Sequence, residues 1–377
     1  MSNTEDPFET VGTVTPEADD RPRPGGRPGP KDRDHQKRYI IIDPETGDYR
    51  RFKNGNKQGL TRVTTFVKAA SDSKALNDWG KRNVLIGASR RPDLVTKAHG
   101  LDHANGKTAL ACLVEELEDA AGAKVSANIG TEVHEWTELI DLGYATPDDA
   151  PPQYRAQLKL YVTTLRDAGL VPVHNLIERT TMVHEFGGVV GTFDRIYLHE
   201  PSGTYLVGDV KTGQTLSYGL DEIQAQLWCY AHGTNQNGLF DWNTKTWGAP
   251  WDGLGVPNTM PPLTRVSEIE GVIVHMPVQG DEAGTVRLRH ADLEAGARYA
   301  ELCGSVRAFP KSKVTDWRPP FEPQAWEQQF ARVTSGEEAT ALWKLAKRDG
   351  VAGVRLNELV AIARQALSRV DTLALGS

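Results

Sequence analysis

The sequence is poor in cysteine and has no long apolar run. Only three cysteines occur among 377 residues, and no C-x-x-C pair is present, so a disulfide framework is excluded. No apolar run approaches the roughly 20 residues that a membrane-spanning helix needs. No signal peptide opens the chain. We therefore expect a protein that makes no membrane contact and resides inside the cell with its thiols reduced.

The sequence also lacks an excess of positive charge. It carries 43 Lys and Arg against 50 Asp and Glu, a net charge of −7. Nonspecific affinity for nucleic acid comes mainly from neutralisation of phosphates by Lys and Arg. The composition therefore argues against a general DNA-coating protein, and any path for nucleic acid must be a local basic groove.

Two acids lie on a predicted β-hairpin in the middle of the chain. Residues 188–199 and 204–210 are rich in β-branched and aromatic residues, and the Glu-Pro-Ser-Gly sequence between them is a turn signal. Asp194 lies in the first strand, and Asp209 ends the second strand two residues before Lys211. A hairpin would bring the two carboxylates together.

Paired carboxylates at a sheet edge suit Mg²⁺ or Mn²⁺, which prefer oxygen ligands. Lys211 points to the same strand face as Asp209, where an ammonium group can orient or help deprotonate a water and balance phosphate charge. Glu178, on a strand predicted over residues 173–185, is a second-tier ligand candidate. A lone D-x-K is more often a pair of solvated acids with a chance lysine, so the neighbouring elements decide.

Two predicted helices flank the hairpin in sequence. The helix over residues 129–143 carries His134 and Glu138 four residues apart, and the helix after the hairpin places Gln226 and Tyr230 with the same spacing. A lone helical histidine is more often a satisfied core or surface group than a ligand. As a ligand, His134 could have its imidazole oriented by Glu138. A zinc-protease H-E-x-x-H motif is excluded, because the second histidine is absent.

These elements, in this order, resemble the RecB-type branch of the PD-(D/E)XK nuclease superfamily. The G-x-x-x-H, G-x-x-D-R, D-x-K and Q-x-x-x-Y elements of that branch match residues 130–134, 191–195, 209–211 and 226–230. The resemblance implies an α/β, restriction-endonuclease-like core with a mixed central sheet flanked by helices. To this core the sequence adds a small C-terminal helical piece.

The resemblance also implies a role for each matched residue. Asp194, Asp209 and Lys211 would be catalytic. The expected metal ligands are His134, Asp194, Asp209 and the backbone carbonyl of Val210. The residues expected to contact the DNA strand are Arg195, Gln226 and Tyr230. Several relatives hold an iron–sulphur cluster with four cysteines, and this chain has only Cys112, Cys229 and Cys303, so no cluster is expected.

The expected function is therefore a Mg²⁺- or Mn²⁺-dependent DNA exonuclease in recombination, repair or phage DNA processing. It would act on single- or double-stranded ends of linear DNA in the cytoplasm of a bacterial host cell, with a recombination protein as a possible partner. The alternatives are an endonuclease of the same fold and a noncatalytic DNA-binding recombination scaffold. Retention of both acids and the lysine favours the enzyme, because a scaffold has no chemical need for them.

The chain divides into three predicted parts. Residues 1–37 combine charge, Pro and Gly with little apolar surface, and we expect a disordered tail. Residues 38–316 form the expected nuclease domain, with its catalytic core at 129–310. Residues 317–377 form a helical extension, with helices expected over 337–349 and 356–370. The extension is a DNA-binding or oligomerisation unit or a plain helical hairpin.

Two further segments could contact DNA. Residues 61–97 hold eight basic and three acidic residues. Lys81 and Arg82 could line a DNA track with Trp79 as a stacking group, although a solvated helix face with Trp79 in the core is equally compatible. Residues 235–266 lack periodicity and are expected to form a loop, in which Trp242 and Trp247 could stack on bases.

Overall fold

The computed structural model describes residues 23–217, 219–248, 265–309 and 323–374. The chain forms two compact units, Met1–Phe309 and Pro310–Ser377. The predicted domain boundary at residue 316 falls in the segment 310–322, which lies outside the described residues.

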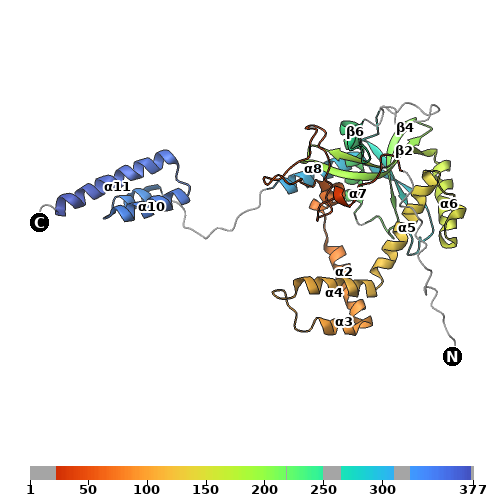
Figure 1. Ribbon diagram of the computed structural model, residues 1–377, viewed down its shortest axis with the longest axis horizontal. Coiled ribbons are helices and arrows are strands. Elements are labelled where there is room, and N and C mark those ends of the chain that lie inside the picture. Colours follow the sequence, from red (N-terminus) through yellow and green to blue (C-terminus); the bar gives the residue numbers. More distant parts are fainter. Residues whose placement is uncertain (1–22, 218, 249–264, 310–322, 375–377) are drawn as a thin grey trace. The chain divides into compact units, whose positions relative to one another are not determined.

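One mixed sheet of eight strands forms the centre of the first unit (Figure 1). The strands are β1 Thr61–Arg62, β2 Leu170–Val183, β3 Val189–His199, β4 Thr204–Lys211, β5 Leu239–Asp241, β6 Thr246–Gly248, β7 Glu270–His275 and β8 Arg287–Asp292. Their order is β6-β5-β2-β3-β4-β7-β8, and β1 pairs with β3. The β4–β7 and β1–β3 pairs are parallel, and the other named pairs are antiparallel.

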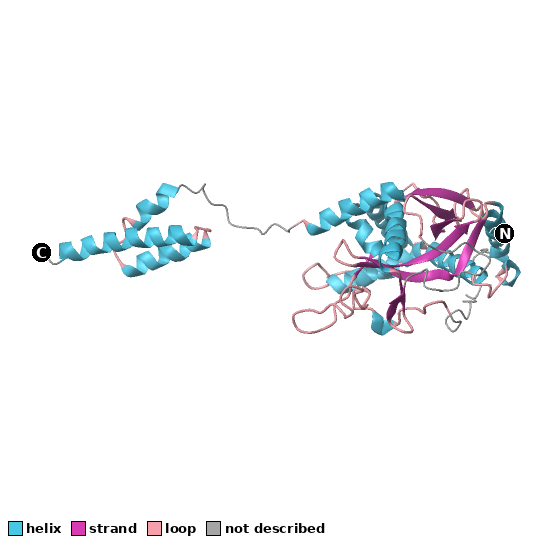
Figure 2. Ribbon diagram, turned by 90° about the horizontal axis from the view of Figure 1, so that it is seen from above, coloured by secondary structure: helices cyan, strands magenta, loops and turns pink. Residues whose placement is uncertain are grey.

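Helices cover both faces of this sheet (Figure 2). The helices of the first unit are α1 Val63–Phe66, α2 Lys74–Arg90, α3 Pro92–Lys97, α4 Lys107–Ala120, α5 Ala123–Asp141, α6 Pro152–Asp167, α7 Leu220–Asn237 and α8 Leu293–Ala308, with 3-10 turns at Pro30–Asp32, Val67–Ala70 and Pro147–Asp149. Apolar residues of α5 and α6 pack on one face, and those of α1, α7 and α8 pack on the other. The predicted α/β class, with a mixed sheet flanked by helices, is confirmed. None of the described helices is both long and apolar enough to cross a membrane.

The predicted hairpin is present as β3 and β4. Alternation along β4 sends Val207 into the core under α7 and α8 and Leu206 into the core under α5 and α6. The pair Arg195–Gly208 is the last in the β3–β4 ladder before the two acids. The predicted flanking helices correspond to α5 and α7, and both are longer than expected.

The expected disorder of residues 1–37 is wrong for residues 23–37, which dock on the first unit. The Gly25 carbonyl accepts a hydrogen bond from the Trp242 backbone N–H at 2.7 Å. Asp32 forms an ion pair with Lys245 at 2.8 Å, and Arg33 forms a β-bridge with Tyr39. The low apolar content of this segment predicts disorder, but the segment is held by backbone pairing and by opposite charges. Residues 1–22 lie outside the described residues.

The expected DNA-contacting role is wrong for Trp242, which is buried, and stays a prediction for the half-buried Trp247. Residues 239–248 form the strands β5 and β6, which extend the sheet beyond β2. Trp242 is only 4% exposed, and its indole N–H donates to the Thr180 hydroxyl at 2.8 Å. The indole of Trp247 donates to the Ile42 carbonyl at 2.7 Å. The rest of the expected loop, at 249–264, lies outside the described residues.

The basic segment forms a helical group of its own. The helices α2, α3 and α4 pack around Leu94, Leu113 and Leu117 (Figure 1). Trp79 is 46% exposed, so the alternative that places it in the core is wrong. Lys81 is exposed and pairs with Asp78. A DNA track along α2, including the exposed Arg82, stays a prediction.

The second unit is a small helical piece, as predicted. It comprises α9 Pro323–Phe330, α10 Gly336–Arg348 and α11 Gly353–Ala374. Phe330, Ala346 and Leu359 form the centre of its core. The helix α9 had no counterpart among the expected helices, because Pro323 and the Pro-rich segment before it indicate a linker.

Trp242→Ala should destabilise the protein without a direct effect on a ligand site. Loss of a buried aromatic side chain and its hydrogen bond to Thr180 should lower the free energy of unfolding by about 3–5 kcal/mol. Trp79→Ala is the matched control, because that side chain is half-exposed, and should cost about 1 kcal/mol or less. Urea unfolding measures both, and equal losses would contradict the placement of Trp242 in the core.

Candidate functional site

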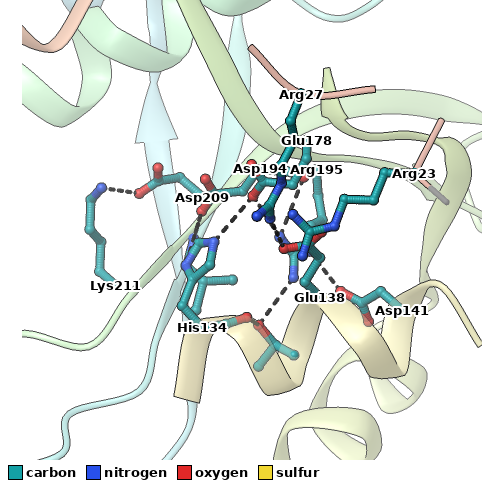
Figure 3. Close-up of polar contacts among 12 residues, drawn as sticks. Arg23, Arg27, His134, Glu138, Asp141, Glu178, Asp194, Arg195, Asp209 and Lys211 are labelled. Atoms are coloured by element: carbon teal, nitrogen blue, oxygen red, sulfur yellow. Dashed lines mark hydrogen bonds and ion pairs between the residues drawn. The ribbon is translucent and has the colours of Figure 1, made fainter. Parts of the chain in front are cut away.

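His134 projects from α5 toward the middle of β2 and β3, where Glu178 and Asp194 lie (Figure 3). Its Nε2 lies 3.2 Å from Glu178 Oε1, and its Nδ1 lies 3.7 Å from Asp194 Oδ2. Gly130, one turn earlier, permits this approach, because a Cβ there would lie 2.5 Å from the Thr212 hydroxyl. The G-x-x-x-H spacing therefore brings α5 against the segment that follows β4.

Asp194 and Asp209 meet at the end of the β3–β4 hairpin, as predicted. Asp194 Oδ2 accepts a hydrogen bond from the Val210 backbone N–H at 2.8 Å. Asp209 is 2% exposed, and its Oδ2 lies 2.5 Å from Lys211 Nζ. Gln226 Nε2, on α7, donates to Asp209 Oδ1 at 3.3 Å. Both acids and the lysine are thus fixed by contacts within the site.

Glu178 is held in a strained conformation at this site. Its φ is +52°, a left-handed value that costs a non-glycine residue energy. The residue follows an irregularity in the β2–β3 register between Pro172 and Ile177, and such bulges re-aim side chains. Strain at a buried carboxylate beside a histidine indicates a positional requirement, which raises Glu178 from a second-tier candidate to a central one.

The described residues contain a grouping of donors that could hold a metal ion. One ligand atom from each of His134, Glu178 and Asp194 lies within 4.8 Å of the others. One imidazole with two carboxylates is a donor set for a divalent cation. The predicted ligand Asp209 is not part of this grouping, and its carboxylate pairs with Lys211. Val210, whose backbone carbonyl is the other predicted ligand, lines the adjoining cavity.

The charge state of His134 fits a site built for a cation. Burial alone would lower the pKa of its imidazole, but the charge of Asp194 and the hydrogen bond with Glu178 raise this pKa to about 9. Burial would likewise lower the pKa of Lys211, and the carboxylates of Asp209 and Asp194 raise it above its ordinary value. The carboxylates around His134 therefore stabilise positive charge, which either the protonated imidazole or a bound metal ion would supply.

Glu138 pairs with two arginines of the N-terminal segment. Arg23 Nε lies 2.6 Å from Oε1, and Arg27 Nη2 lies 2.8 Å from Oε2. Burial and the charge of Glu178 raise the pKa of Glu138 to about 7, which Arg27 opposes. The expectation that Glu138 orients the His134 imidazole is wrong, since Glu178 makes that contact. Neither arginine was predicted as a site residue, because the composition of residues 1–37 indicates a disordered tail.

Arg195 does not contact DNA, contrary to expectation. Its side chain is fully buried against α5, and its Nη1 lies 3.7 Å from Glu178 Oε1, beside the donor grouping. Its Nε lies 2.7 Å from Asp141 Oδ2, and its Nη2 donates to the Thr137 hydroxyl at 3.1 Å. This ion pair fastens β3 to α5. The spacing of His134, Thr137 and Asp141 along one helix face was the signal that could have indicated it.

Tyr230 is likewise a core residue, and the expected DNA contact is wrong. It is 2% exposed, and a Cβ at Gly191 would lie 2.4 Å from its ring. The glycine of one matched element therefore makes room for the tyrosine of another. Gln226 is half-buried and positions Asp209, whereas a contact between Gln226 and DNA stays a prediction.

A cavity of about 460 Å³ opens beside the donor grouping. Its polar lining includes Arg27, His134, Glu138, Glu178 and Lys211. Lys211 and Arg27 lie on different sides of the carboxylates (Figure 3). These two cations offset part of the negative charge that an anionic substrate would meet in the cavity.

Stability should depend on pH through His134. Its folded pKa of about 9 exceeds its ordinary value of 6.5, so its stabilising contribution is complete below pH 6.5 and lost as the pH rises through 9. In EDTA, His134→Gln should therefore lower the melting temperature most at pH 6 and least above pH 9. Thermal melts of wild type and variant measure the difference. The exposed His99 provides the control variant, and a pH-independent effect of His134→Gln would contradict the assignment.

Comparisons with known proteins found no family model that matches the chain and no curated protein that matches it. The resemblance drawn from the sequence thus stays a prediction, and the functional argument rests on the geometry of the site.

Proposed function

We propose that the protein is a divalent-metal-dependent deoxyribonuclease that hydrolyses phosphodiester bonds from the ends of DNA. The observation that carries the proposal is the grouping of His134, Glu178 and Asp194 next to the Asp209–Lys211 pair. A metal-binding grouping, a further carboxylate and a fixed lysine on adjacent strands are the components of metal-assisted phosphoryl transfer.

His134, Glu178 and Asp194 would hold Mg²⁺ or Mn²⁺, which when bound polarises a phosphate oxygen and lowers the pKa of a water. Lys211 would act on the water or on the phosphate. Because its raised pKa keeps it cationic, it donates hydrogen bonds to the attacking water or to the phosphate and stabilises negative charge there. Asp209 fixes the ammonium group, and Gln226 fixes Asp209.

Charge supports action at ends. With a net charge of −7, the protein is poorly equipped to gain affinity from phosphates along a duplex. The cations of the cavity, Lys211 and Arg27, are local to the site. A strand that enters by its terminus needs only such local contacts. Recombination, repair or phage DNA processing in a bacterial host cell is the setting that we propose, with a recombination protein as a possible partner.

The direct test is incubation of end-labelled linear DNA and covalently closed circles of equal length with the protein. Both single- and double-stranded forms are used, with Mg²⁺, with Mn²⁺ and in EDTA. The proposal expects metal-dependent loss of linear DNA and little cutting of circles. Cutting of circles at the same rate indicates an endonuclease, and binding without cleavage indicates a scaffold.

Asp209→Asn and Lys211→Met should each reduce cleavage by about 100-fold or more, the range in which a positioned acid–base or charge-stabilising group acts. Asp209→Asn should change the melting temperature little, because it also removes repulsion between Asp209 and Asp194, whereas Lys211→Met should lower it, because Asp209 is left buried without its cation. Lys159→Met is the control for Lys211→Met, since Lys159 is half-exposed and pairs with Asp148. Cleavage rates at saturating Mn²⁺ decide, and full activity in either site variant contradicts the assignment.

A further inference from the structure

We propose that Arg27 binds the phosphate backbone of the nucleic acid, on the other side of the carboxylates from Lys211. This inference rests on the proposed function, because it assigns a phosphate-binding residue to the same site. With this role for Arg27, the docked N-terminal segment contributes a substrate-binding residue to the site.

The first observation is a difference between the two arginines that share Glu138. Arg23 is 5% exposed, whereas Arg27 is 43% exposed, although both lie within 2.8 Å of the same carboxylate. Glu138 itself is 1% exposed. A buried carboxylate needs a compensating charge, and Arg23 beside Oε1 still supplies one when Arg27 leaves Oε2. Arg27 can therefore leave Glu138 without stranding an unpaired buried charge.

The second observation is the direction of Arg27. It lines the cavity together with His134 and Lys211, and in Figure 3 its guanidinium reaches from the N-terminal segment toward the carboxylates. Glu138 is its only hydrogen-bond partner among the described residues. A guanidinium has five N–H donors in a planar fork, so most of them are available to the two free oxygens of a phosphodiester.

The third observation is that the segment is held in place. The Gly25 carbonyl accepts from the Trp242 backbone N–H at 2.7 Å, and Trp242 belongs to the core. Gly25 and Gly26 form a turn with φ of 71° and 67°, which favours glycine. A Cβ on Gly25 would also lie 2.4 Å from Arg179 Nε. Arg27 is thus positioned before a ligand arrives, which reduces the entropic cost of binding.

Electrostatics explains why a second cation is needed. Glu138, Glu178, Asp194 and Asp209 are all buried or nearly so at this edge, and they repel an incoming phosphate. Lys211 is already paired with Asp209. Arg27 supplies a further charge from a different element, so a strand held by both cations lies between the N-terminal segment and β4.

The test compares Arg27→Ala, Arg27→Lys and Arg23→Ala in the full-length chain. Binding is measured by fluorescence anisotropy of a labelled single-stranded oligonucleotide in Ca²⁺, with salt varied. KM and kcat are measured in Mn²⁺, Mn²⁺ affinity by calorimetry, and stability by thermal melting. Arg27→Ala should weaken oligonucleotide binding about tenfold and lower the salt slope by about 0.7, the value for one lost phosphate contact on a single strand.

The same variant should raise KM while the melting temperature and Mn²⁺ affinity stay near wild type, and Arg27→Lys should recover part of the binding. Arg23→Ala is the matched control and should instead lower the melting temperature, because it removes the buried partner of Glu138. Wild-type binding and salt slope in Arg27→Ala overturn the proposal, as does a melting temperature lowered as far as in Arg23→Ala.

The outcomes also separate this proposal from the proposed function. A wild-type protein that binds the oligonucleotide but does not cut it overturns the nuclease function, while the binding comparison still decides the role of Arg27. Cleavage by wild type together with unaltered binding and KM in Arg27→Ala overturns the role of Arg27 alone. Failure of the wild-type protein to bind the oligonucleotide overturns the role of Arg27, while cleavage of single- and double-stranded linear DNA still decides the nuclease function.

Discussion

Neutralisation of buried charge where α5 meets the central strands β2, β3 and β4 is the constraint on which the site depends. Carboxylates there have little contact with water, and unpaired buried charge is costly. Each is matched by a nearby cation, which for every carboxylate except Asp209 comes from another element. The pairs are Arg195 with Asp141, Arg23 and Arg27 with Glu138, Lys211 with Asp209, and His134 with Glu178 and Asp194. Because the other pairs join α5 to β2, β3 and the N-terminal segment, they position the site and also hold these elements together.

The members of the site differ in how replaceable their partners are. Arg195 has Asp141 and Thr137 around it and is fully buried, so it serves as a fixed structural cation. His134 is different, because its positive charge is a proton, which a metal ion could displace. This arrangement explains the strained backbone of Glu178, since that conformation brings a second carboxylate to the His134 imidazole. The structure thus separates cations that fasten the fold from a position where charge can be exchanged.

Local patterns made the core of the fold predictable. Alternation and turn residues located β3 and β4, and the i, i+4 spacing located α5 and α7 with His134 and Gln226 on them. Long-range pairing was not predictable. Arg195, Tyr230 and Trp242 have residue types that suit DNA contacts, and nothing local to each shows that Asp141, Gly191 or Thr180 covers it. The docking of the N-terminal segment was not predictable for a related reason, because its partners, Glu138 and Trp242, lie more than one hundred residues away.

The central claim is that His134, Glu178 and Asp194 hold one divalent cation. Anomalous diffraction from crystals soaked in Mn²⁺ tests it most directly, because it locates the ion among its ligands. The account predicts a peak between His134 and the two carboxylates, and its loss in Glu178→Gln. A peak at Asp43, Glu45 and His184, the other such grouping among the described residues, with none near His134, would contradict the account, as would no bound Mn²⁺ at all.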